Sequence, residues 1–148
     1  MAKKKIDFNY QVNNPQQLYY PLDKINGQVS LTNREPEEIR LKKFYAILFE
    51  GWYQVDKSRE RGLTSSSKFW DWKTKTHGKL LFCKGRTLAP NETIEFEFEM
   101  HMPKKWKPKI KKRKYKGWRF NIGFYHKTRM KSRKAGSFLI PVEFGRQA

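Results

Sequence analysis

The chain has 148 residues, with 33 Lys and Arg against 14 Asp and Glu, and a formal net charge of +19. Its 37% hydrophobic and 16% aromatic residues can form a core rich in aromatic rings, and this length favours a single domain over 1–148. A single cysteine excludes an internal disulfide, and no apolar run is long enough for a membrane span. No apolar segment of a secretory signal follows the Lys-rich start, so we expect a cytoplasmic protein.

Alternation of apolar and polar residues recurs along the chain, and this period of two is typical of β-strands. The clearest case is 94–102, where the polar positions include Glu95, Glu97 and Glu99. Segment 39–53 predicts a long strand with a bulge near Lys43–Phe44. The predicted strands are 6–10, 25–32, 39–53, 94–102, 118–125 and 138–144, with one or two more within 68–82.

Turn-forming residues separate these predicted strands. They occur at 13–15, 33–36, 62–67 and 88–91, and 35–38 is compatible with a short helical turn. We expect long loops at 58–67 and 104–116. Seven to eight short strands with regular breaks predict an all-β fold, an antiparallel β-sandwich of the immunoglobulin or arrestin type.

Two blocks of sequence carry a resemblance to a known family. In the first, Tyr20-Pro21-Leu22-Asp23 precedes a strand that contains Gly27, and an Asn-x-x-Pro turn follows at 33–36. In the second, Leu88-Ala89-Pro90-Asn91 precedes the alternating strand, which ends at Met102-Pro103.

The order of these blocks resembles the N-terminal domain of the arrestin family, across roughly residues 5–144. Leu22 and Asn91 stand where that family usually has Gly, and the chain has one domain where arrestins have two. The resemblance implies an arrestin-like β-sandwich. It also implies a family role as an adaptor, and the unusual basicity of the segment after Pro103 speaks against that role.

The positive charge is concentrated in the second half of the chain. Residues 1–67 carry 11 basic and 8 acidic residues, whereas residues 68–148 carry 22 and 6. Nine of the thirteen residues in 104–116 are basic, as are five of the eight in the second predicted basic loop, 127–134. Because like charges this dense repel one another, they indicate a polyanionic partner.

Aromatic residues are interleaved with these charges. Trp106 is the best candidate for an exposed ring that stacks on an unpaired base, while Trp118 is expected in the core. Both interpretations remain open for Trp70 and Trp72. The predicted RNA-binding residues are Lys73, Lys75, Lys104, Lys105, Trp106, Lys107, Lys109, Lys111, Lys112, Arg113, Lys114, Lys116, Arg119, Lys127, Arg129, Lys131, Arg133 and Lys134.

Residues suited to catalysis are sparse, so we expect no enzyme, no catalytic residue, no cofactor and no metal site. His77, His101 and His126 fall on different predicted elements. Cys83 has no cysteine partner for a zinc site and is expected to be a strand residue. The three glutamates of 94–102 are expected to form a solvent-facing row that pairs with nearby lysines.

Three functions remain as hypotheses. The first is an RNA-binding protein associated with the ribosome, either as a component contacting ribosomal RNA and proteins or as a factor controlling subunit association or dormancy. The second is an arrestin-like adaptor that binds a peptide or phosphorylated tail, and the third is a peripheral protein bound to anionic membrane through 104–116. A sheet edge also offers a route to a homo-oligomer.

Overall fold

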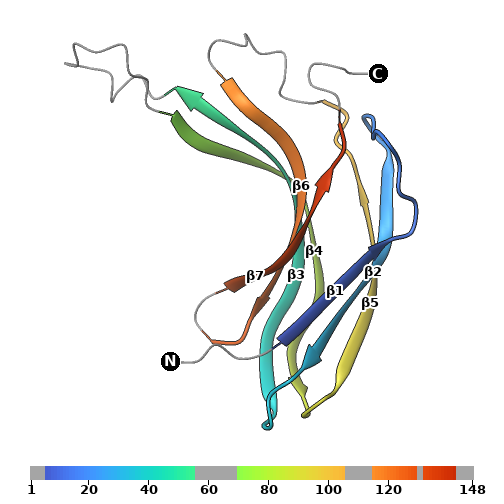
Figure 1. Cartoon of the computed structure of the whole chain (residues 1–148), viewed down its shortest axis with the longest axis vertical. Helices are drawn as coiled ribbons and strands as arrows, with labels where there is room; N and C mark the ends of the chain where they lie inside the picture. The colour runs from blue at the N-terminus through green and yellow to red at the C-terminus, as the bar shows by residue number, and fades with distance from the viewer. Residues whose placement is uncertain (1–5, 56–69, 106–114, 130–131, 143–148) are drawn as a thin grey trace, which may run out of the picture.

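The computed structural model describes residues 6–55, 70–105, 115–129 and 132–142, and all its regular structure is β-strand. Figure 1 shows the strands arranged as two facing layers. The strands are β1 (Ile6–Val12), β2 (Lys24–Asn33), β3 (Ile39–Val55), β4 (Trp70–Leu88), β5 (Thr93–His101), β6 (Tyr115–Lys127) and β7 (Ser132–Ile140).

The two layers are antiparallel sheets with the orders β1-β2-β5 and β4-β3-β6-β7. This arrangement confirms the predicted all-β sandwich. The prediction of one or two strands within 68–82 is corrected in extent, because β4 is one strand of 19 residues that continues to Leu88. Its chain continues through Gly85 at φ +64°, where a residue with a side chain would be strained.

The core lies between the sheets and is built from the apolar positions of the alternating strands. In β5, Ile94, Phe98 and Met100 are buried, whereas the glutamates between them are exposed. Aromatic rings meet across the layers, for example Phe98 and Phe124 with ring centroids 5.6 Å apart. Burial of these aliphatic and aromatic side chains stabilises the sandwich.

The long strand β3 has two register irregularities in its pairing with β4 and a third, between Gly51 and Tyr53, in its pairing with β6. The first lies between Phe44 and Tyr45, close to the bulge predicted near Lys43–Phe44, and the second lies between Leu48 and Phe49. Such bulges increase strand twist and curvature. In Figure 1 the four-stranded sheet curves away from the three-stranded sheet along its length, so its outer side is concave.

The two turns that carry the family resemblance share one geometry. Leu22 and Asn91 adopt φ of 70° and 63°. Asp23 N–H donates to Tyr20 O at 3.0 Å, and an equivalent 3.0 Å bond closes the second turn. A proline followed by a residue of positive φ is the pattern of a type II turn. These are the two positions where Gly was expected from the resemblance, so the geometry explains that preference.

Several loop predictions need revision. Segment 127–134 is no long loop, because β6 runs to Lys127 and β7 begins at Ser132. The segment 104–116 also ends inside β6, and 35–38 forms bends without a helix. The predicted loop at 58–67 and residues 106–114 lie outside the described residues. The described part of the chain contains no helix of the length and hydropathy that a membrane crossing requires.

Candidate nucleic-acid interface

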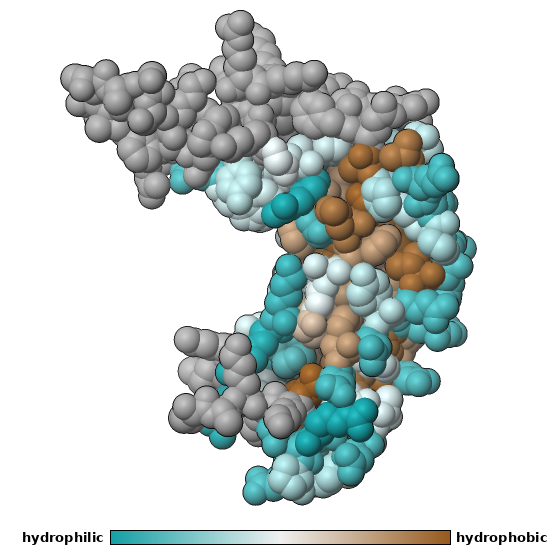
Figure 2. Space-filling view, viewed as in Figure 1, coloured by the Kyte–Doolittle hydropathy of each residue, from teal (hydrophilic) through white to brown (hydrophobic). Residues whose placement is uncertain are grey.

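The outer face of the four-stranded sheet, called the concave face below, is the strongest candidate for a binding surface. Figure 2 shows the molecule hollowed on this side. Strand pairing sets its side chains in rows that cross the sheet from β4 through β3 and β6 to β7. The rows are Lys84–Lys43–Lys127–Ser132, Leu81–Tyr45–Tyr125–Lys134, Lys79–Ile47–Gly123–Ser137, Thr76–Phe49–Asn121–Leu139, Thr74–Gly51–Arg119 and Trp72–Tyr53.

The charged side chains of these rows all have the same sign. Six are cations, Lys43, Lys79, Lys84, Arg119, Lys127 and Lys134, and no described residue of the rows is Asp or Glu. Three of the lysines, Lys84, Lys43 and Lys127, stand directly opposite one another on adjacent strands. Like charges in such pairs destabilise a sheet, so this row is better suited to a bound anion than to water.

Aromatic rings lie between the cations. Tyr45 and Tyr125 stack with ring centroids 5.4 Å apart, and the Tyr45 hydroxyl donates to Ser132 Oγ at 2.8 Å. Partial burial, followed by the neighbouring Tyr45, raises the pKa of Tyr125, so its hydroxyl remains protonated at neutral pH. The concave face therefore combines fixed positive charge with uncharged rings.

A ring cluster stands at the end of the concave face where β3 meets β4. The Trp72 indole packs against Tyr53 with ring centroids 4.9 Å apart. The Arg119 guanidinium carbon lies over the same indole, 4.6 Å from its centroid. Next to this cluster is a hollow of about 350 Å³, lined by Phe49, Trp72, Arg119, Asn121, Lys134, Ser137 and Leu139.

The outer face of the three-stranded sheet, called the acidic face below, has the opposite charge. Its exposed acids are Asp7 on β1 and Glu95, Glu97 and Glu99 on β5. The exposure of the three glutamates confirms the predicted solvent-facing row, and Lys24 approaches one of them, Glu99, at 3.8 Å. Arg34 pairs with Asp7 at 2.7 Å.

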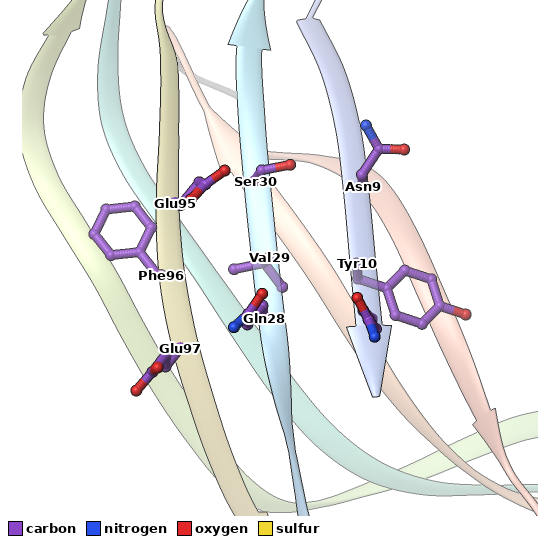
Figure 3. Close-up of a pocket in the computed structure, with 9 residues that line it drawn as sticks. Asn9, Tyr10, Gln28, Val29, Ser30, Glu95, Phe96 and Glu97 are labelled. Atoms are coloured by element: carbon purple, nitrogen blue, oxygen red, sulfur yellow. The ribbon is translucent and has the colours of Figure 1, made fainter. Parts of the chain in front are cut away.

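A second hollow, of about 400 Å³, lies at the acidic face. Figure 3 shows Glu95 beside Ser30 and Glu97 beside Gln28, as their pairing across β2 and β5 requires. Although this hollow is the larger of the two, its two carboxylates would repel a phosphate backbone. The acidic face is therefore unsuited to nucleic acid.

The carboxylate of Glu50, on the inner face of the four-stranded sheet, is fully buried. Glu50 is 0% exposed, accepts a hydrogen bond from Trp118 Nε1 at 2.6 Å and lies 2.9 Å from His77 Nε2. These contacts join β3, β6 and β4. They confirm the prediction that Trp118 packs with the core. Glu50 itself was not predicted, although an isolated carboxylate in the apolar run of 39–53 was a signal for it.

The three histidines lie on three strands, as predicted, but two of them line one cavity. His77 of β4 and His101 of β5 both border a hollow of about 260 Å³, which lies between these two strands. His126 is buried on β6, and its Nδ1 has no hydrogen-bond partner among the described residues. The described residues contain no cluster of three side chains suited to a metal ion.

Cys83 lies within β4, as predicted. Its burial raises the pKa of the thiol, with Arg86 acting in the opposite direction. Because the thiolate is the reactive form, this environment suits a structural residue.

The structure divides the predicted RNA-binding residues. Arg119, Lys127 and Lys134 lie on the concave face, and Lys116 pairs with Tyr53 at its end. Lys73 and Lys75 are exposed, but strand alternation places them on the opposite face of β4 from Trp72. Four others, Lys104, Lys105, Arg129 and Arg133, are exposed outside the rows. The remainder, Trp106, Lys107, Lys109, Lys111, Lys112, Arg113, Lys114 and Lys131, lie outside the described residues.

Sequence reasoning missed part of the concave face. Lys43, Lys79 and Lys84 lie outside the two dense basic runs, and only the pairing of β3 with β4 places them together. Tyr53 and Phe49 belonged to a predicted strand whose outward side was not assigned. Their alternation with the buried Leu48 and Trp52 was the available signal.

Comparison with known proteins supports the fold. No family model matches the chain, and no curated protein matches its sequence. The sporulation control protein Spo0M from Bacillus subtilis has a similar structure, with a TM-score of 0.68 and 12% identity over 96% of this chain. The chain spans about half of that protein's length, 50%. A likeness at this identity indicates a shared fold.

Two further solved structures are only slightly similar. The alkylpurine DNA glycosylase AlkC of Pseudomonas fluorescens, bound to DNA, gives a TM-score of 0.47 at 12% identity, over 96% of this chain and 31% of its own. The β-glucosidase EmGH1 of Erythrobacter marinus gives 0.38 at 11% identity, over 93% of this chain and 15% of its own. At these scores neither carries an argument about this chain.

Proposed function

We propose that this chain is a non-enzymatic, cytoplasmic RNA-binding protein that uses an arrestin-like β-sandwich as its scaffold. The observation that carries the proposal is the separation of charge between the two outer faces of the sandwich. Every charged side chain in the described rows of the concave face is a cation, whereas the opposite face carries four exposed acids. Phosphate contacts from such cations supply affinity that does not depend on sequence.

The row Lys84–Lys43–Lys127 gives the proposal a physical reason. Three ammonium groups side by side cost free energy in the unbound protein, and a phosphate backbone crossing the sheet would relieve this repulsion. The basic segment 104–116 adds nine more cations to the same chain. Together they suit a partner with many regularly spaced phosphates, of which RNA of the ribosome is the candidate that we propose.

The arrestin-like assignment is part of the same proposal. The positive φ of Leu22 and Asn91 supports it, because these turns fall at the positions where the family has Gly. A role as a protein adaptor or as an anionic-membrane binder would use the same cations on phosphorylated protein or lipid. These roles are the alternative outcomes of the test.

Sucrose-gradient sedimentation of native lysate, with and without RNase, tests the proposal. We expect the protein to migrate with ribosomal particles at low salt and to return to the top of the gradient after RNase treatment. Migration as a small free species in both gradients would contradict ribosome association. A complex that survives RNase would favour the adaptor role, and binding only to anionic vesicles would favour the membrane role.

A further inference from the structure

The ring cluster at the end of the concave face holds an aromatic ring against a guanidinium group. Binding to phosphates alone would not need such a ring. Gly51 of β3 leaves room for the Trp72 indole, because a Cβ at Gly51 would lie 2.2 Å from Trp72 Cζ2. The indole therefore lies across the strand toward Arg119, which pairs with Gly51 from β6. Three neighbouring strands thus hold one stack of ring and guanidinium.

The hollow beside this stack offers the other groups that a planar, polar ring would need. Asn121 contributes an amide that both donates and accepts hydrogen bonds, and Ser137 contributes a hydroxyl. Leu139, 59% exposed, forms an apolar side. Lys134 supplies a cation at the same hollow.

We propose that this hollow binds an unpaired nucleobase of single-stranded RNA. The base stacks on the Trp72–Arg119 pair, Asn121 and Ser137 contact its polar edge, and Lys134 contacts the adjoining phosphate. This inference rests on the proposed RNA-binding function and adds that the concave face prefers single strands. In an RNA duplex the base faces are covered by their neighbours, so a duplex can use the cations but not the stack.

Fluorescence anisotropy with an unstructured single-stranded RNA and a duplex of equal length tests this preference. We expect Trp72→Ala to weaken single-strand binding on the order of tenfold or more, because loss of one stacked base has about that effect. Duplex binding should be unchanged. Trp72→Phe, which keeps a ring, should retain most of the single-strand affinity.

The salt dependence separates the ring from the charges. Trp72→Ala should lower single-strand affinity by the same factor at every salt concentration, because the indole carries no charge. Lys134→Gln, which removes the proposed phosphate contact, should lower the affinity and also reduce the salt slope by about one. Leu22→Ala, which removes an exposed apolar side chain outside the concave face, is the matched control and should change neither.

The outcomes distinguish this inference from the proposed function. Equal affinity of the wild-type protein for single strand and duplex, or an unchanged preference in Trp72→Ala, would overturn the base-binding inference and leave RNA binding in place. Absence of binding to either RNA would overturn both proposals. Equal loss of single-strand and duplex binding in Trp72→Ala would also overturn the inference, because the indole would then support only the sheet.

Discussion

Leu22 is a single residue whose backbone conflicts with its side chain. Its φ of 70° is rare for a residue with a branched, bulky side chain, and 61% exposure means that the side chain recovers little by burial. We expect Leu22→Gly to raise the free energy of unfolding by about 0.5 to 1 kcal/mol, net of the flexibility that glycine adds to the unfolded chain. Urea denaturation measures this difference.

Asn91 provides the matched control for that prediction. It has nearly the same φ, 63°, but asparagine tolerates the left-handed region well. Asn91→Gly should therefore change stability much less than Leu22→Gly. Destabilisation by Leu22→Gly would show that the leucine side chain contributes more by packing than its backbone costs.

His126 is the residue from which we expect a specific pH dependence. Burial, followed by the charge of Arg133, lowers its pKa below the ordinary value of 6.5. The unfolded chain therefore takes up a proton first as pH falls, and protonation favours unfolding. The stability that depends on neutral His126 is fully present above pH 6.5 and is lost as pH decreases below it.

Comparison of the wild-type protein with His126→Gln isolates this contribution. The stability of the variant relative to wild type should increase as pH is lowered from about 7 to 5, because the other titrating groups cancel in the difference. Urea unfolding at several pH values measures it, and His101→Gln, at an exposed position on β5, controls for loss of an imidazole. A pH-independent difference for His126→Gln would contradict the prediction.

At the scale of elements, Glu50 links three strands of one sheet. Replacing only the carboxylate leaves the Trp118 indole N–H and the His77 ring nitrogen without this partner. Loss of a hydrogen-bond partner at such a site costs about 1 to 3 kcal/mol for each bond, so we expect Glu50→Leu to lower the free energy of unfolding by about 2 to 5 kcal/mol.

Two variants give this prediction its controls. Glu50→Gln keeps an acceptor for Trp118 and should cost less than Glu50→Leu. Glu97→Gln, on the exposed side of β5, should change stability by less than about 0.5 kcal/mol. Wild-type stability in Glu50→Leu, measured by urea denaturation, would show that the network does not hold the strands together.

The strands show how far sequence reasoning reaches. Local alternation predicted β1, β2 and β5, because burial on one face leaves a period of two in the sequence, and an apolar stretch without a central Gly or Pro predicted β3. Pairing between strands depends on contacts that are distant in the chain. Hence the row formed by Lys84, Lys43 and Lys127 could not be read from their positions, which are far apart in sequence.

At the scale of the whole molecule, charge is separated in two different ways. Along the chain, the excess lies in residues 68–148, and that much was visible in the sequence. In the folded protein, positive and negative side chains lie on different faces. Lys43 from the first half of the chain lies on the concave face, whereas Glu95, Glu97 and Glu99 from the second half lie on the other sheet. The sequence thus predicts a polyanionic partner, and the sheet register was needed to show which cations share one face.

The basic segment 104–116 provides a prediction that depends on charge alone. Replacement of Lys111, Lys112, Arg113 and Lys114 by Gln should strongly weaken RNA binding and reduce its salt slope. Thermal stability should change little, because solvent-screened charge interactions contribute little to folding. Unchanged RNA affinity in this variant would exclude the segment from the binding mechanism.

In the row Lys84–Lys43–Lys127, we expect removal of one charge to weaken RNA binding and to increase stability. Lys43 stands between Lys84 and Lys127, so Lys43→Gln removes two like-charge pairs and should raise the free energy of unfolding by about 0.2 to 1 kcal/mol. The same change should weaken RNA binding and reduce its salt slope by about one. Lys24→Gln, which removes a cation from the acidic face, should leave RNA affinity unchanged. If Lys43→Gln instead destabilised the protein without affecting RNA binding, the row would be structural and the concave face would not be the binding surface.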